Sequence, residues 1–536
     1  MAKQDKWDYI VIGGGTTGCV LANRLSEAPE SRVLLIDAGR NDNHLFTRIP
    51  AGQMRAFLRP DMNWLYNSEA DSSRNSQIDI WPAGKIIGGG SAINGMMHVR
   101  GHHTDYDQWE QLGNSGWSYN DVLPFFKKSE CSEIGDPEVR GTKGPQHVSK
   151  IRIQNPLNEA FLNAAQEIGI PFNADLNGFC QEGVGPCQAI QKNGRRYSSA
   201  QAFLRPVLHR KNLKILLQSQ VLRILVKNDR AEGIEYISDG EHYQADASRG
   251  VVLCAGAIAS PKILMLSGIG AEKELSKQAI PIRLDLPGVG KNLQDHPVIR
   301  VSFNLQGVRT LTSDLSNPFF SFQHLINYLW NRRGALSTCI GHVQAFVKTR
   351  SPLAAPNAQI IFAPLAYELT DHGPKPCRSP AAGVGIGLCR TASRGNVRLR
   401  DSDPFSAPII DLSLLSEYDD IQQLREAIVM TREIFSSPSL ARFVIDERKP
   451  GREFCSDDDL DNYIRSESGL MYHACGTCKM GNDKMSVVDA RLKVHGMDSL
   501  WIADASIFPT IPAGNINATC LMVGEKAAHM ITLEAS

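Results

Sequence analysis

A glycine-rich turn near the N-terminus has residue types that suit binding to a phosphate. It holds Gly13, Gly15, Thr16, Thr17 and Gly18. Without a Cβ, Gly13 and Gly15 let backbone N–H groups approach a pyrophosphate, and Gly18 lets a following helix pack closely. The turn therefore predicts a nucleotide site.

A second group of residues, near the C-terminus, could move a proton. His473 lies in the segment 472–481, YHACGTCKMG, and Asn515 follows further along the chain. Histidine can act as a base because its ordinary pKa lies near working pH. An asparagine amide can position an oxygen atom, although it cannot act as a base near neutral pH. Two alternatives stay open: Asn517 offers a rival amide, and Asn515 could instead cap a following helix.

The elements around the glycine turn support the nucleotide prediction. The apolar run 8–12 (DYIVI) predicts a buried strand, 19–25 (CVLANRL) a helix, and 32–36 (RVLLI) a second strand that ends at Asp37. Strand, turn, helix and strand with a terminal acidic residue form the dinucleotide-binding βαβ unit. We expect Asp37 to accept hydrogen bonds from ribose hydroxyls and to disfavour a 2′-phosphate.

Three further stretches are rich in glycine or polar residues. Residues 81–100 contain consecutive glycines followed by Asn94, so we expect a loop passing close to a flat ligand. The apolar run 250–254 predicts a strand, and the glycine-rich stretch 256–270 that follows it predicts a turn and a short helix. Residues 288–297 read as a tight polar loop.

The remaining pattern predicts two domains of different class. From about 300 to 455, strand-like runs alternate with turns and a helix over 420–435 intervenes, which indicates a mostly antiparallel sheet with helices on one face. A strand over 500–503, ending at Asp504, and a helix over 521–531 return to the first domain. We predict an α/β, Rossmann-like domain of residues 1–300 and 456–536, and an α+β substrate domain of residues 301–455. A substrate-domain insertion near 150–205 is left open.

Composition narrows the classes of partner. Lys and Arg number 57, as do Asp and Glu, so nothing favours a nucleic acid. The N-terminus lacks a signal-peptide layout and no stretch is long enough to span a bilayer. We expect a cytoplasmic protein, with peripheral contact to the inner face of the membrane left open. The oligomeric state is not predicted.

Four segments together resemble the glucose–methanol–choline (GMC) oxidoreductases over nearly the whole chain. They are 13–18, 84–94, 256–270 and the C-terminal pair 472–481 and 503–517. The chain looks most like bacterial members acting on aliphatic alcohols, polyols or polyethers, such as alkanol, sorbose and polyethylene glycol dehydrogenases.

The resemblance implies FAD as the cofactor. Besides the glycine turn and Asp37, the residues that would contact it are Trp64, Asn94, Met97, Val221, Tyr472, Asp504 and Ala505. Some relatives attach the flavin to a histidine near the position of Asn94. Here Ile93 precedes Asn94, so we predict non-covalent FAD, although His98 lies a few residues on.

The implied reaction is oxidation of a neutral primary alcohol to the aldehyde. By resemblance His473 takes the hydroxyl proton, Asn515 positions the substrate oxygen, and hydride passes to flavin N5. The absence of an obvious acidic cluster beside His473 disfavours a cation such as choline. The acceptor stays open between a quinone, a soluble carrier and O₂, the last making an alcohol oxidase. The alternatives are an FAD-containing hydroxynitrile lyase of the same fold, a non-catalytic flavoprotein and an NAD-linked dehydrogenase.

We predict no metal site. The spacing of His98, His102 and His103 without a nearby Cys or paired carboxylate is poor for zinc, and we expect these residues at the surface or between domains. The pair Cys475 and Cys478 belongs to the C-terminal motif, and we do not expect it to be redox-active.

Overall fold

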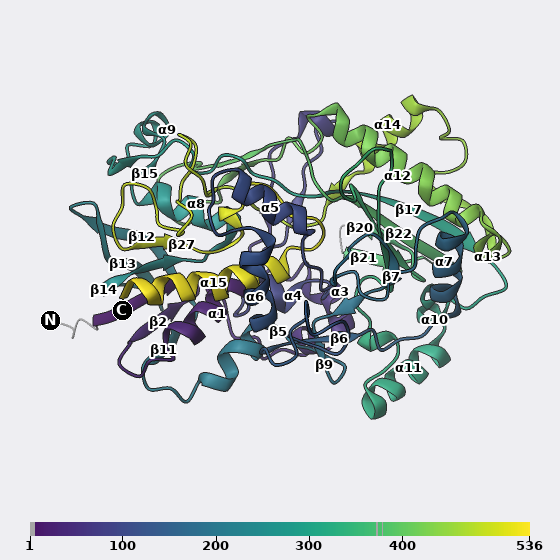
Figure 1. Ribbon diagram of the computed structural model, residues 1–536, viewed down its shortest axis with the longest axis horizontal. Coiled ribbons are helices and arrows are strands. Elements are labelled where there is room, and N and C mark those ends of the chain that lie inside the picture. The colour runs from purple at the N-terminus through teal and green to yellow at the C-terminus, as the bar shows by residue number, and fades with distance from the viewer. Residues whose placement is uncertain (1–5, 371–372, 378, 536) are drawn as a thin grey trace.

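The computed structural model describes residues 6–370, 373–377 and 379–535. Its two large sheets lie toward opposite ends of the longest axis, and both chain ends lie beside the first sheet (Figure 1). This arrangement confirms the predicted fold class, a Rossmann-like α/β unit with a mostly antiparallel second unit.

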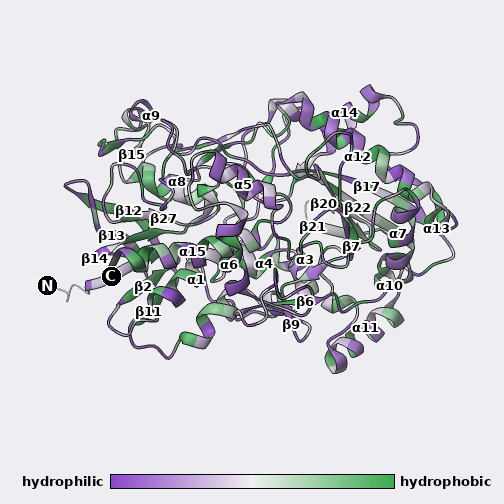
Figure 2. Cartoon of the chain, viewed as in Figure 1, coloured by the Kyte–Doolittle hydropathy of each residue, from purple (hydrophilic) through white to green (hydrophobic). Residues whose placement is uncertain are grey.

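The first sheet contains the predicted βαβ unit. In order across the sheet, its strands are β11 (Leu213–Leu216), β2 (Val33–Ile36), β1 (Lys6–Ile12), β14 (Glu241–Leu253), β13 (Arg230–Ser238) and β12 (Ser219–Lys227), with β27 (Leu500–Ile502) also on β14. Strands β11, β2, β1, β14 and β27 run parallel, and β12 and β13 add an antiparallel pair. The central strands are apolar because both of their faces are covered (Figure 2).

Two helices close one face of this sheet. α1 (Thr16–Leu25) packs along α15 (Asn517–Ala535), so the C-terminal helix returns to the first βαβ unit (Figure 1). The helix begins at Asn517, four residues before the predicted start. The contact places the start of α15 next to the glycine turn.

The second sheet is antiparallel throughout. Its order is β25 (Val444–Lys449), β17 (Pro297–Leu305), β22 (Ala381–Leu388), β19 (Ala358–Ala363), β18 (Val343–Val347) and β7 (Gly183–Pro186), with the short β26 (Gly469–Leu470) beside β17. One face packs against α7 (Pro156–Glu167), α12 (Tyr418–Ser436) and α14 (Asp457–Glu467). The sheet draws β7 from the 150–205 region, and the boundaries at 300 and 455 remain our proposal.

One local expectation was wrong. The glycine-rich stretch 81–100, predicted as a loop, contains the short helix α4 (Gly90–Ile93). Gly90 is the first residue of that helix rather than an interior one, where the entropic cost of glycine would be greatest. Among the described residues, no helix is long and apolar enough to cross a membrane.

Candidate active site

The structure brings His473 and Asn515 together. His473 follows β26, and Asn515 lies just before α15. Asn515 Nδ2 lies 3.2 Å from His473 Nε2. Because an amide nitrogen only donates, Nε2 of His473 is the acceptor, which is the unprotonated nitrogen that a general base requires. The rival amide points elsewhere, since Asn517 Nδ2 donates to Thr16 Oγ1 at 3.0 Å.

A second histidine fixes the orientation of the first. Nδ1 of His473 lies 2.9 Å from Nδ1 of His296, which precedes β17. A neutral histidine carries one ring proton, so when Nε2 of His473 is unprotonated the proton is on its Nδ1. His473 Nδ1 then donates to His296 Nδ1, and this bond favours that tautomer of His473. The backbone N–H groups of His296 and His473 both donate to Asp295 Oδ1, at 2.7 and 2.8 Å. Asp295 thereby ties the two histidine segments together.

Sequence reasoning assigned no role to Asp295 or His296. The only signal was that both end the polar loop 288–297, with His296 directly before a strand-forming run. Their ligand-type atoms and one from His473 lie within 4.8 Å of each other. A metal bound there would have to break the bond between the histidines, so the geometry favours a hydrogen-bonded pair.

Two amides from the second sheet extend the network. Gln359 on β19 donates to Asn515 Oδ1 at 3.5 Å and to Gln344 Oε1 on β18 at 3.0 Å. This contact shows that the sheet face opposite the helices is the face that contacts Asn515. One cross-strand row on that face reads Gly185, Gln344, Ile361, Gly385 and Arg300. A Cβ at Gly385 would meet only Val298, at 3.8 Å, so β22 leaves room there.

Burial sets the protonation states of this group. It lowers the pKa of His473 well below 6.5, with a smaller contribution from His296, and lowers that of His296 to about 4. Burial also raises the pKa of Asp295 to about 8, against the backbone N–H groups that favour its ionised form. Near neutral pH both histidines are therefore neutral, and His473 is ready to take a proton.

The glycine turn fits a pyrophosphate. A Cβ at Gly18 would meet Gly13 O at 1.9 Å, so only glycine lets α1 start this close to β1. Around Gly15, by contrast, a Cβ would meet only Cys254 O, at 3.9 Å, and around Gly90 and Gly256 it would meet nothing within 4 Å. The space beside the backbone of Gly15, Gly90 and Gly256 is therefore unfilled by protein atoms. This suits the approach of a pyrophosphate to the start of α1.

A partly buried carboxyl group, Asp37, and a buried one, Asp504, flank this opening. Asp37 accepts from Gly14 N and Gly39 N, both at 2.6 Å, and burial raises its pKa to about 6 despite these bonds. An open cavity of about 540 Å³ begins at the neighbouring Gly39 and reaches Gln220, next to Val221. Asp504 Oδ2 accepts from Gly256 N at 2.8 Å, and Ala505 follows it. The sites predicted for the ribose, the adenine and the phosphate therefore adjoin one another.

A buried arginine holds the segment predicted to line the flavin. Arg196 donates to Asn94 Oδ1 at 2.8 Å and to Asn94 O at 2.7 Å, and burial lowers its pKa to about 9. Met97 is buried and its sulfur lies near Gly341. Trp64 and Tyr472, the remaining predicted contacts, pack on one shared apolar cluster. Sequence reasoning missed Arg196, which no motif marks.

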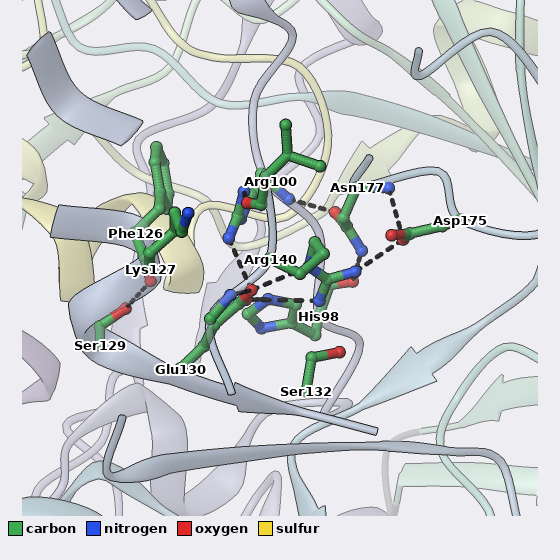
Figure 3. Close-up of polar contacts among 12 residues, drawn as sticks. His98, Arg100, Phe126, Lys127, Ser129, Glu130, Ser132, Arg140, Asp175 and Asn177 are labelled. Carbon is green, nitrogen blue, oxygen red and sulfur yellow. Dashed lines mark hydrogen bonds and ion pairs between the residues drawn. The ribbon is translucent and has the colours of Figure 1, made fainter. Parts of the chain in front are cut away.

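The segment beyond Met97 enters a buried ionic cluster centred on Glu130 (Figure 3). The carboxylate of Glu130 lies 3.0 Å from His98 Nε2, accepts from Arg100 at 2.6 Å and accepts from Arg140 Nε at 2.8 Å. Arg140 also donates to Asp175 at 2.6 Å. His98 and His102 are buried, so they are not surface residues; His102 instead caps the helix α5 (His103–Gln111).

Family models match most of the chain. Two models described as GMC oxidoreductase match residues 7–298 and 391–524. The chain is 39% identical to the mitochondrial choline dehydrogenase of Mus musculus, over 98% of this chain and 90% of the relative. It is also 39% identical to the alcohol dehydrogenase [acceptor] of Pseudomonas putida, over 98% of this chain and 95% of the relative.

Solved structures match equally broadly. Pyridoxine 4-oxidase of Mesorbium loti is 30% identical, with a TM-score of 0.88 and 98% of each chain covered. A variant of the Aspergillus oryzae formate oxidase, studied for its FAD modification, is 27% identical, with a TM-score of 0.92 and 99% of each chain covered.

Proposed function

The chain belongs to the GMC oxidoreductase family, an enzyme class with FAD as its cofactor, and we propose that it oxidises a neutral primary alcohol to the aldehyde. The observation that carries this proposal is the hydrogen-bonded series Asn515, His473 and His296. It leaves an unprotonated Nε2 beside an amide that can hold a hydroxyl oxygen. Bound FAD would supply the acceptor for the hydride.

The roles of the side chains follow from this geometry. His473 Nε2 removes the hydroxyl proton as the C–H bond is broken, and Asn515 Nδ2 hydrogen-bonds the substrate oxygen. His296 keeps the second nitrogen of His473 engaged. His296 is buried, and His473 and Asn515 are partly buried. Desolvation of His473 lowers its pKa, which keeps the base unprotonated at neutral pH.

FAD is proposed to bind without a covalent link. The glycine turn and Gly256 would hold its pyrophosphate, and Asp37 its ribose. At the flavin end, Ile93 offers no atom for attachment, and His98 Nε2 is engaged by Glu130 inside the buried cluster. Acid precipitation of the protein should release the yellow cofactor into the supernatant, whereas retained colour in the pellet would contradict non-covalent binding.

The charges at the site support a neutral substrate. The second sheet contacts Asn515 through the uncharged amide of Gln359, which is itself bonded to the uncharged amide of Gln344. The one charged member of the cross-strand row that contains Gln344 is cationic, Arg300, which interacts with Tyr472. Asp295 is the adjacent carboxyl group, and its raised pKa leaves it largely neutral at pH 7. A quaternary ammonium would find no fixed negative charge among these groups.

Choline is the second candidate because it gives its name to several relatives at 38–39% identity. The two candidates separate in a direct comparison of kcat/KM for choline and for uncharged analogues of similar size, such as 3,3-dimethyl-1-butanol. We expect the uncharged alcohol to be preferred. A clear preference for choline would replace our proposal with a choline dehydrogenase.

The decisive experiment is an anaerobic visible spectrum before and after addition of alcohols from short alkanols to polyols and glycol ethers. Bleaching of the flavin band that persists until a quinone or another carrier is added supports a dehydrogenase. Bleaching that reverses rapidly in air supports an oxidase. If no alcohol bleaches the band, alcohol oxidation is excluded, and the hydroxynitrile lyase alternative is tested next.

A further inference from the structure

The helix α11 (Pro318–Asn331) exposes an unusual amount of apolar surface. Phe319, Phe322 and Trp330 are 69%, 61% and 79% exposed. Leu325, Ile326 and Leu329 are exposed as well, and the spacing of three and four residues puts the apolar side chains on one side of the helix. Single exposed apolar residues are ordinary, but a continuous stripe of this kind marks a contact surface.

The helix is well formed without burying this stripe. Asn317 caps its N-terminus by accepting from Phe319 N, Pro318 occupies the first turn, and Arg332 ends it in the left-handed conformation. Tyr328 is the one residue of α11 that is buried. In Figure 1 the helix lies at the outer edge of the second unit, below α10 (Leu311–Ser316). Its stripe is therefore not part of the core of the molecule.

The charges near α11 are mostly positive. The helix has no Asp or Glu, and Arg332 and the exposed Arg333 follow it directly. The hairpin of β9 (Gln191–Lys192) and β10 (Arg195–Arg196) packs against Arg332 through Gly194 and adds the exposed Lys192 and Arg195. The nearby Asp314 is already paired with Arg309 and His324, at 3.0 Å each. An apolar stripe with aromatic residues beside a group of cations is the pattern of an interfacial helix.

We propose that α11 and these cations dock the protein onto an anionic lipid bilayer. The stripe Phe319, Phe322, Leu325, Ile326, Leu329 and Trp330 would enter the boundary between headgroups and acyl chains. Lys192, Arg195, Arg332 and Arg333 would lie among the negatively charged headgroups. The helix lies on the membrane and does not span it. A protein partner would need to offer acidic groups matched to cations on two separate segments, the β9–β10 hairpin and the end of α11. An anionic lipid surface contacts both segments without needing a specific shape.

The docking face continues toward the segment predicted to line the flavin. The chain runs from α11 to Ile340, which is exposed and donates from its backbone N–H to Gly95 O at 3.2 Å. Gly95 is the neighbour of Asn94. Docking through α11 would hold this side of the active site close to the bilayer. The proposal does not depend on the alcohol chemistry, because the surface and its charges exist whatever the substrate is.

The test is co-sedimentation of the FAD-loaded protein with vesicles. We expect binding to vesicles of phosphatidylcholine with 30% phosphatidylglycerol at low salt, and weaker binding as salt rises. Phe322→Ser with Trp330→Ser should lower the partition coefficient at least about tenfold. Arg333→Glu should lower it about fivefold or more on anionic vesicles, and far less on pure phosphatidylcholine.

Matched controls separate docking from loss of fold. Phe405→Ser removes a comparably exposed aromatic residue from a turn outside α11 and should leave binding unchanged. Flavin content and visible spectrum confirm the fold of each variant. The proposal is overturned if the wild-type protein stays in the supernatant with anionic vesicles at low salt. It is also overturned if sedimentation velocity shows an oligomer that the Phe322/Trp330 variant dissociates while vesicles bind neither, because the stripe then contacts a second copy.

Discussion

His473 can serve as a base only while its Nε2 carries no proton, and its neighbours in the structure favour that state. Substitution His473→Ala removes the acceptor while leaving the FAD-binding residues in place. We expect FAD content to be unchanged and the rate of anaerobic flavin reduction by alcohol to fall by about two orders of magnitude or more. His103→Ala, an exposed histidine far along the chain, is the control. Near-normal reduction in the His473 variant would contradict the assignment.

The pH dependence of the same rate tests the surroundings of His473. Burial, and secondly His296, lower its pKa well below 6.5. Since the neutral form is active, the rate of flavin reduction should persist as pH falls through 6.5 and decline only at lower pH. The measurement is a stopped-flow pH profile on the wild-type protein. A decline centred at or above pH 6.5 would show that the pKa of His473 is not lowered in the enzyme with alcohol bound.

His296 is a positioning residue, and it has its own test. His296→Leu removes the group that engages His473 Nδ1, so the tautomer is no longer fixed. We expect the maximal rate to fall at least about tenfold with a smaller change in KM, and the acid limb of the profile to move to higher pH. His296→Asn retains a hydrogen-bonding group and should recover part of the rate. If both variants lose activity equally with an unmoved pH profile, His296 acts only in packing.

At the scale of single elements, local patterns predicted the first βαβ unit well. Strand β1, helix α1 and strand β2 follow from runs of apolar residues around glycines whose close approaches admit no side chain. The partners of the His473 and Asn515 pair could not be predicted in this way, because they are distant in sequence. His296 reaches His473 from the residue before β17, and Gln359 reaches Asn515 from β19. Their placement depends on the register of the second sheet, which periodicity alone does not determine.

Two glycines of the first unit should respond differently to the same substitution. Gly18→Ala would place a Cβ 1.9 Å from Gly13 O, so α1 must move and the protein should lose both FAD and thermal stability. Gly90→Ala meets nothing within 4 Å in the protein, and its backbone needs no positive φ. If Gly90 faces the pyrophosphate, this variant should keep the stability of the apoprotein but bind FAD at least about tenfold more weakly. The measurements are thermal unfolding of the apoproteins and titration with FAD. Unchanged FAD affinity in Gly90→Ala would remove this residue from the cofactor site.

At the scale of the whole molecule, the Glu130 cluster connects segments that local patterns leave unrelated. Its members come from the end of the segment predicted to line the flavin, from β5 (Glu130–Ser132), from the loop at Arg140 and from the loop that leads to β7 (Figure 3). Sequence reasoning placed His98 at the surface or between domains because a single histidine carries no sign of a buried acid 32 residues away. The cluster therefore couples the cofactor side of the molecule to the start of the second sheet.

This cluster should make stability depend on pH in the acid range. Burial disfavours the charged form of Glu130, yet Arg100, His98 and Arg140 together hold its pKa well below 4.5. A carboxylate with a lowered folded-state pKa stabilises the protein fully above its unfolded value, about 4.3, and this contribution is lost as pH falls from about 5 toward the folded-state pKa.

Glu130→Gln leaves Arg100 and Arg140 buried without their anion and should cost about 3–5 kcal/mol at pH 7. The variant should also show a shallower loss of stability between pH 5 and 3 than the wild-type protein, measured as thermal midpoints by tryptophan fluorescence with FAD bound. Glu235→Gln, which breaks the partly exposed pair with Arg223, should cost only about 0.2–1 kcal/mol. Equal effects of the two substitutions would show that the cluster does not carry the stability its burial implies.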